Sequence, residues 1–284
     1  MAEIFKGLPV HRLVLPCGDE LVVALHGAHV LSWVAQGRER LYLSPNSAMD
    51  GHAAIRGGVP VCFPQFNQRG PLPKHGFARN LPWQVQSSEA SADGHVLTLA
   101  LTDSTTTRAF WPQAFEAQLR LDLQPRNLTL TLKVINRDSQ ALDMTGALHT
   151  YLAVDNIAQT RLMGLQGQAE WDSLTDTHAQ AAAELQFDAE FDRVYAASPR
   201  PLLLQDGAYR LQIEQSATWL NQVVWNPGEI KCAQMSDLPQ DGYRHMLCVE
   251  AAQVDAPVRI SAQGTWQGWQ RLSVLQDSRS TDGH

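Results

Sequence analysis

The sequence predicts an all-β protein built from large antiparallel sheets. Apolar and polar residues alternate over many short segments, which is the pattern of half-buried strands. No segment keeps an apolar stripe of helical period over several turns. Of the 284 residues, 44% are hydrophobic, so the chain can bury a sizeable core. Since no repeat, low-complexity tract or long polar linker divides it, we expect a single domain over residues 1–284.

The clearest strands form a hairpin. Leucines alternate with polar residues over 119–123 (LRLDL), and the alternation resumes over 128–134 (LTLTLKV) after a turn. The same period of two recurs over 96–102, 209–214 and 257–261. We therefore expect strands at all five segments, and turns this frequent favour a sandwich of antiparallel sheets.

Helix is expected only in a few short pieces. The best candidate is the segment 179–184 (AQAAAE), which is rich in residues of high helix propensity. It is too short to change the predicted fold class.

Charge, cysteine content and hydropathy exclude several kinds of partner. The formal net charge of −7 gives the chain no general attraction for nucleic acid. The four cysteines form no Cys-x-x-Cys pair, which argues against a zinc knuckle or a dithiol redox motif and favours reduced thiols. No apolar segment approaches the length of a membrane span, and no heptad repeat calls for a partner. We therefore expect a cytoplasmic monomer that binds neither nucleic acid nor membrane.

Glycine and proline concentrate between residues 55 and 82, and such a segment forms rigid loops, where a scaffold usually presents function. Its stretch 72–80 (LPKHGFARN) places Lys74, His75 and Arg79 within six residues. With Arg56, these cations could bind one phosphate monoester, because a guanidinium offers a planar fork of donors. Taken singly, each arginine could instead pair with a carboxylate or lie along the surface.

Candidates for proton transfer lie outside this loop. His149 falls at the expected end of a strand, and histidine has an ordinary pKa of about 6.5, although a lone strand histidine can also be structural. Glu250 follows the apolar run 246–249 (MLCV), so we expect it on a buried strand, where desolvation raises a carboxyl pKa. The alternative for Glu250 is an ion pair at a strand end. Asp192 could bind a sugar hydroxyl or pair with Arg193.

Six motifs occur in one order along the chain: 55–66 (IRGGVPVCFPQF), 72–80 (LPKHGFARN), 148–151 (LHTY), 191–195 (FDRVY), 224–226 (VWN) and 248–250 (CVE). This combination resembles the glucose-6-phosphate 1-epimerases, also called hexose-6-phosphate mutarotases, from about residue 24 to about residue 250. The resemblance implies a galactose mutarotase-like β-supersandwich. It also implies interconversion of the α and β anomers of aldohexose 6-phosphates, chiefly glucose 6-phosphate, without a metal or an organic cofactor.

The same resemblance implies roles for individual residues. The catalytic pair is the histidine of the LHTY motif, His149, and the glutamate of the CVE motif, Glu250. The substrate-binding positions are Arg56, Lys74, Arg79 and Asp192.

These residue types suit the opening of a sugar ring, which needs a base to take the proton of the C1 hydroxyl and an acid to protonate the ring oxygen. We expect Glu250 to be the base and protonated His149 to be the acid, with the roles exchanged when the ring closes. We expect His75 to hydrogen-bond sugar oxygens and Trp225 to offer a flat apolar wall to the sugar.

Two other functions remain open for the same residues. A non-catalytic carbohydrate-binding or sugar-phosphate-sensing β-sandwich would use the same cleft without proton transfer. A glycoside hydrolase would use Asp192 and Glu250 as paired carboxylates at a defined separation.

Overall fold

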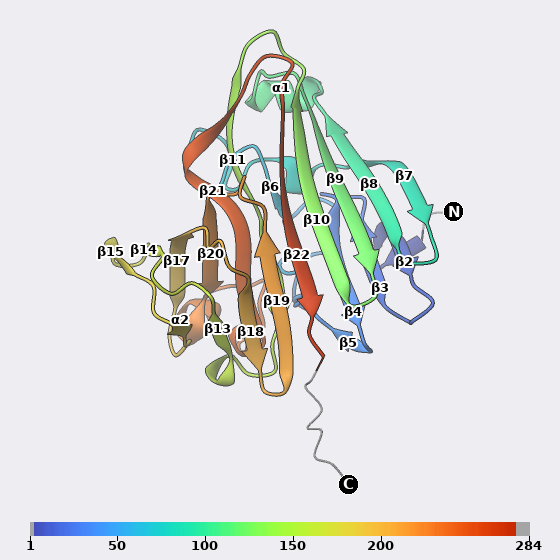
Figure 1. The fold of residues 1–284 in the computed structure, drawn as a ribbon. Helices are drawn as coiled ribbons and strands as arrows, with labels where there is room; N and C mark the ends of the chain where they lie inside the picture. The colour runs from blue at the N-terminus through green and yellow to red at the C-terminus, as the bar shows by residue number, and fades with distance from the viewer. Residues whose placement is uncertain (1–2, 277–284) are drawn as a thin grey trace.

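The computed structural model describes residues 3–276 and confirms the all-β prediction (Figure 1). Three antiparallel sheets carry most of the chain, and the helices are short. The two larger sheets lie against each other, and their facing side chains form one large buried cluster with side chains of the smaller sheet. The expectation of a single domain stays a prediction, and this shared core favours it.

The largest sheet has nine strands, and the predicted hairpin lies near its centre. Leu123 pairs with Leu128 across the turn, and the alternate leucines on both strands are fully buried. The predicted strands at 96–102 and 209–214 belong to the same sheet. In spatial order its strands are β16 (Glu184–Leu185), β13 (Arg161–Met163), β18 (Leu202–Asp206), β19 (Tyr209–Gln215), β22 (Thr265–Val274), β10 (Asn127–Asn136), β9 (Phe115–Gln124), β8 (His95–Thr102) and β7 (Gln84–Ala90).

The second sheet has eight strands and contains the predicted strand at 257–261, as part of a longer strand. In spatial order it runs through β15 (Thr177–Gln180), β14 (Ala169–Asp172), β17 (Phe191–Ala196), β20 (Asn221–Asn226), β21 (Met246–Ile260), β11 (Leu142–Leu148) and β6 (Val61–Cys62). The short strand β12 (Tyr151–Ala153) also pairs with β21, beyond the end of β11.

The third sheet has five strands in sequence order, and five short helices complete the fold. The strands are β1 (Glu3–Phe5), β2 (Leu8–Val14), β3 (Glu20–Ala24), β4 (His29–Ala35) and β5 (Arg38–Glu39). The helices are α1 (Thr105–Phe110), α2 (Gly228–Cys232) and the 3-10 helices η1 (Ala78–Asn80), η2 (Ile157–Gln159) and η3 (Gly242–His245).

The prediction of a helix over 179–184 is wrong. Strand β15 ends at Gln180 and pairs with β14 in a hairpin, and Glu184 already belongs to β16. Between them Ala181 is buried in the core. A six-residue helix has a costly nucleus and few hydrogen bonds, so sheet pairing and burial outweigh the helix propensity of the alanines.

Residues 246–254 of strand β21 are buried on both faces, which explains the continuous apolar run that precedes Glu250. Leu247, Val249 and Ala251 point into the large core, whereas Cys248 and Glu250 alternate with them on the opposite face. The prediction that Glu250 lies on a buried strand is confirmed, since this residue is 1% exposed.

Over residues 3–276, no helix is long and apolar enough to cross a membrane. All four cysteines lie in this range and are free. The reduced state expected from the sequence therefore agrees with the structure.

The loop that follows β5 is held at Gly58 by two backbone hydrogen bonds, one within the loop and one to β12. Its backbone N–H donates to the carbonyl of Tyr42 at 2.7 Å, and its carbonyl accepts from the N–H of Tyr151 at 2.9 Å. Gly58 has φ +60°, and a Cβ at this position would run into the carbonyl oxygen of Val30 and the ring of His29. Glycine is required here by both the backbone conformation and the close approach.

We expect Gly58→Ala to lower the free energy of unfolding by more than about 2 kcal/mol, because a left-handed alanine costs about 1–2 kcal/mol and Val30 must also move. Urea denaturation measures this loss. Gly37→Ala is the matched control, since Gly37 has φ +71° with no atom near its Cβ, and its loss should be about 1 kcal/mol. Equal losses in the two variants would show that the close approach to Val30 does not matter.

Candidate active site

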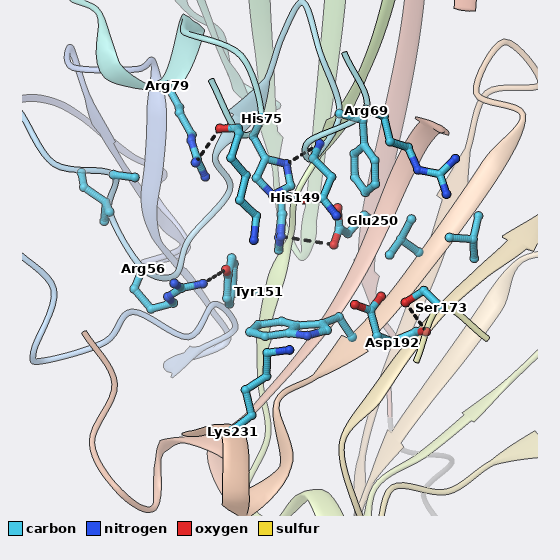
Figure 2. A pocket seen from close by; sticks show the side chains of 18 of the residues that line it. Arg56, Arg69, His75, Arg79, His149, Tyr151, Ser173, Asp192, Lys231 and Glu250 are labelled. Atoms are coloured by element: carbon cyan, nitrogen blue, oxygen red, sulfur yellow. Dashed lines mark hydrogen bonds and ion pairs between the residues drawn. The ribbon is translucent and has the colours of Figure 1, made fainter. Parts of the chain in front are cut away.

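One cleft brings together every residue that the sequence singled out as a site residue. It has a volume of about 210 Å³ and lies between one face of the eight-stranded sheet and the loop of residues 54–79 (Figure 2). Its lining includes all eight predicted site residues: Arg56, Lys74, His75, Arg79, His149, Asp192, Trp225 and Glu250.

Sheet register places the two predicted catalytic side chains opposite each other. At the end of β11, Leu148 pairs with Ala251 of β21, and β12 continues in the same register along that strand. His149 therefore faces Glu250 across the strands, and its Nε2 lies 3.3 Å from Oε1 of Glu250. Both residues are buried, at 8% and 1% exposed.

A second row of residues crosses the same face two positions along the strands. Register aligns Tyr151, Cys248, Trp225 and Asp192 across β12, β21, β20 and β17. Because residues two apart on a strand share a face, this row lies beside His149 and Glu250. The Tyr151 ring stacks on the His149 ring, with centroids 4.8 Å apart and planes 10° apart.

A buried glutamine ties together the two strand segments that carry the pair. Oγ1 of Thr150 donates to Oε1 of Gln270 at 2.5 Å, and Nε2 of Gln270 donates to the carbonyl of Val249 at 3.0 Å. The N–H of Val249 in turn donates to the carbonyl of Thr150 at 3.0 Å. Thr150 is the chain neighbour of His149, and Val249 is the chain neighbour of Glu250. The network through Gln270 therefore holds the spacing between His149 and Glu250.

His75 reaches the pair from the loop. Its backbone is in the left-handed region, with φ +66°, and its Nδ1 accepts from the N–H of Asn67 at 3.3 Å. Burial, followed by the charges of Arg79, Lys74 and Arg56, lowers the pKa of His75 to about 3, so its ring is neutral. With Nδ1 as acceptor, the proton of the neutral ring is on Nε2, which makes His75 a donor.

Arg56, Lys74 and Arg79 form the cationic end of the cleft, and they differ in how their charges are compensated. Arg56 donates from Nε and Nη2 to Oδ2 of Asp237, at 3.0 and 2.9 Å, and from Nη1 to the hydroxyl of Tyr151 at 2.9 Å. The alternative that an arginine pairs with a carboxylate is therefore correct for Arg56.

Lys74 and Arg79 have no such partner. Within the described part of the chain no carboxylate lies within ion-pair distance of either. Arg79 donates from Nη2 to the backbone carbonyl of Lys74 at 3.0 Å, and its Nε is buried without a partner among residues 3–276. Burial, followed by the charges of Arg56 and Arg79, lowers the pKa of Lys74. These two cations leave positive charge available for an anion.

Asp192 does not pair with Arg193, which removes the structural alternative for this carboxylate. Arg193 instead forms ion pairs with Glu170 at 3.0 Å and with Asp172 at 3.3 Å. Burial raises the pKa of Asp192. The Asp192 side chain is therefore available to a ligand in the cleft.

Burial of His149 and Glu250 opposes the protonated form of His149 that we expect for the reaction. Burial, followed by the charge of Asp192, holds the pKa of Glu250 well above its usual range. Burial, followed by His75 and two arginines, holds the pKa of His149 well below its usual range. A neutral pair and an ion pair contain the same number of protons, and burial favours the neutral pair, with the shared proton on Glu250, in the ligand-free cleft.

Sequence reasoning missed several residues of the cleft. The sequence could have indicated Tyr151, because Tyr151 lies two residues from His149 and residues two apart on a strand share a face. Lys231 and Asp237 come from α2 and the turn after it, a segment with no motif, and only the folded structure brings them to the cleft. Lys231 is paired with Glu190 at 2.5 Å.

In the part of the chain that the structure describes, no three histidine, cysteine, aspartate or glutamate side chains are grouped as metal ligands.

Comparison with known proteins gives a consistent result. The sequence model described as aldose 1-epimerase matches residues 12–273. A protein of Escherichia coli (strain K12), provisionally named glucose-6-phosphate 1-epimerase, is 38% identical over 247 residues, which cover 84% of this chain and 82% of that protein. A protein of Cenchrus ciliaris with the same provisional name is 32% identical over 268 residues, covering 90% and 82%.

Solved structures show the same relationship. A provisionally assigned mutarotase from Salmonella typhimurium has a TM-score of 0.89 at 30% identity, over 97% of this chain and 93% of that one. A galactose mutarotase related enzyme from Lactobacillus acidophilus has a TM-score of 0.75 at 13% identity, over 95% and 98%. The second likeness concerns the fold alone, and both agree with the predicted mutarotase-like sandwich.

We expect Gln270→Leu to lower the free energy of unfolding by about 1–3 kcal/mol, because it leaves the Thr150 hydroxyl and the Val249 carbonyl buried without partners. Chemical denaturation measures the change. Gln267→Leu, at an exposed position of the same strand, is the control and should stay within about 0.5 kcal/mol of the parent. A Gln270 variant as stable as this control would contradict the role given to the network.

Proposed function

The chain belongs to the aldose 1-epimerase family, and from this membership we propose that it interconverts the α and β anomers of aldohexose 6-phosphates, chiefly glucose 6-phosphate. One observation supports this most directly. A buried histidine and glutamate in contact lie in the same cleft as Lys74 and Arg79, two cations without carboxylate partners among residues 3–276. The pair suits proton transfer at a sugar ring, and the cations suit a phosphate.

The proposed reaction needs one base and one acid. Glu250, as the carboxylate, takes the proton of the C1 hydroxyl while His149, as the imidazolium, gives a proton to the ring oxygen. The bond from C1 to the ring oxygen breaks and C1 becomes an aldehyde carbon. After rotation about the bond from C1 to C2, the other face of the carbonyl is attacked and both protons return.

The cationic end supports binding of the phosphate. Lys74 and Arg79 offer uncompensated charge, and Arg56 adds a guanidinium that Asp237 and Tyr151 hold in position. Since the phosphate is remote from C1, its binding energy can hold the reacting atoms in place.

The rest of the cleft suits the sugar. Asp192 would accept hydrogen bonds from sugar hydroxyls, and the Nε2–H of His75 would donate to a sugar oxygen. Trp225, only 9% exposed and lying beside the pair, would pack against the apolar face of the ring.

We also propose that the protein acts as a monomer in the cytoplasm. A sugar phosphate carries about two negative charges and does not cross a lipid bilayer unaided, so the proposed substrate favours an intracellular location.

The test of the function is anomer exchange of glucose 6-phosphate, measured by magnetisation-transfer NMR with EDTA present and free glucose alongside. We expect exchange to be accelerated for the phosphate ester and much less for glucose. Binding without acceleration on any aldohexose phosphate would indicate a sugar-phosphate sensor instead.

Replacing either member of the pair should remove most of the activity. We expect His149→Asn and Glu250→Gln each to slow exchange by about 10²–10⁴-fold, the usual contribution of a positioned acid or base. Binding of glucose 6-phosphate, measured by calorimetry, should persist in both. Activity near that of the parent in either variant would exclude that residue as acid or base.

Arginine variants test the phosphate site. We expect Arg79→Met to reduce kcat/KM for glucose 6-phosphate by about 10–100-fold, because it removes a charge-assisted hydrogen bond worth about 1.5–3 kcal/mol. The residual rate with free glucose should not fall in parallel. Parallel losses on both sugars would place the phosphate elsewhere.

A further inference from the structure

Charge is distributed unevenly about the contact between His149 and Glu250. Arg56 and Arg79 lie on the side of His149, whereas Asp192 lies on the side of Glu250 (Figure 2). The charge of both arginines acts on His149, and the charge that acts on Glu250 is that of Asp192. His149 therefore faces positive charge and Glu250 faces negative charge, although the two residues share one proton.

Direct contacts connect the cationic end to His149. Arg56 donates to the hydroxyl of Tyr151 at 2.9 Å, and the Tyr151 ring lies flat against the His149 ring at 4.8 Å. From the other side, the His75 ring lies 5.4 Å from the His149 ring, and its chain neighbour is Lys74. Both contacts lead from the cationic end to the histidine.

The remaining titratable groups in contact with His149 are fixed in charge. Burial raises the pKa of Tyr151, so its phenol stays protonated, and the low pKa of His75 keeps that ring neutral. The location of the shared proton is then decided by the charges at the cationic end and by Asp192.

This arrangement opposes the form that the reaction needs. Positive charge beside His149 repels a proton from it, and the negative charge of Asp192 favours a proton on Glu250. A dianion at the cationic end reverses the first effect, and it does so in a site of low dielectric, where charge interactions are strong.

We propose that the phosphate dianion of the substrate moves the shared proton from Glu250 to His149 and thereby converts the cleft to its reactive form. The inference rests on the proposed function. In this step the O–H bond at Glu250 breaks and an N–H bond forms at Nε2 of His149, with no change in the number of protons and no other reactant. The phosphate is then part of the catalytic apparatus as well as a handle for binding.

The first experiment observes the proton directly. We expect the ring ¹⁵N resonances of His149, assigned with His149→Asn, to report a neutral imidazole in the free protein. Addition of inorganic phosphate, at a pH where it is chiefly a dianion, should convert them to those of an imidazolium. Chloride at matched ionic strength should leave them unchanged.

The second experiment measures the consequence for turnover. Anomer exchange of free glucose should rise at least about tenfold when inorganic phosphate is added, which corresponds to one pKa unit in favour of protonated His149. Arg79→Met should weaken this response, and Lys74→Met serves as the second variant if the first is poorly folded. Arg259→Met is the control that should keep the response, since Arg259 is an exposed side chain paired with Asp143.

The outcomes separate this inference from the proposed function. An imidazolium already present without phosphate, a neutral His149 with phosphate bound, or no binding of phosphate at all would each overturn the inference. So would a converted histidine with no acceleration of glucose exchange. If glucose 6-phosphate is also not turned over, the proposed function fails too; if it is turned over, the inference alone fails.

Discussion

The antiparallel register between β21 and its neighbours β11 and β12 is the constraint on which the site depends. It sets His149 opposite Glu250, and it carries Trp225 and Asp192 into the adjacent row through β20 and β17. A shift by one residue would turn Glu250 into the core and bring Val249 into the cleft. Burial of both faces of β21 prevents such a shift, because each face already has a fixed set of apolar partners.

Some cations of the cleft are paired with carboxylates and others are not. This difference separates side chains that are held in position from side chains that are available to a ligand. Arg56 and Lys231 have carboxylate partners that hold them in place, whereas Lys74 and Arg79 have none within residues 3–276. A half-buried guanidinium without a counter-ion, such as that of Arg79, is costly, and such a cost is retained where a ligand supplies the missing charge. In the proposed activation, the same unpaired charge sets the location of the proton shared by His149 and Glu250, so binding and chemistry share one electrostatic arrangement.

Sequence patterns predicted the strands because alternation and buried runs are local signals, and side-chain chemistry together with the family resemblance predicted eight residues of the cleft. Glu250 was placed on a buried strand from its apolar neighbours alone. The prediction of a helix at 179–184 is wrong because β15 pairs with β14, and helix propensity does not describe such a tertiary interaction. The partner of Arg56 could not be predicted either, because Asp237 is 181 residues away along the chain. The location of the shared proton depends on charges from several segments, which converge only in the folded protein.

The cleft is built from two parts that differ in their freedom to change. The side chains of residues 246–254 on β21 are buried, in the core on one face and at the site on the other, so substitutions there disturb the core and the chemistry together. The segment of residues 54–79, which contributes the two-residue strand β6 to the sheet, and the turn after α2 carry Arg56, Lys74, Arg79 and Asp237. Exchange of these two segments can therefore change the ligand preference while ring opening is preserved. The strands that carry His149 and Glu250 would stay the same, and only the segments that recognise the ligand would differ.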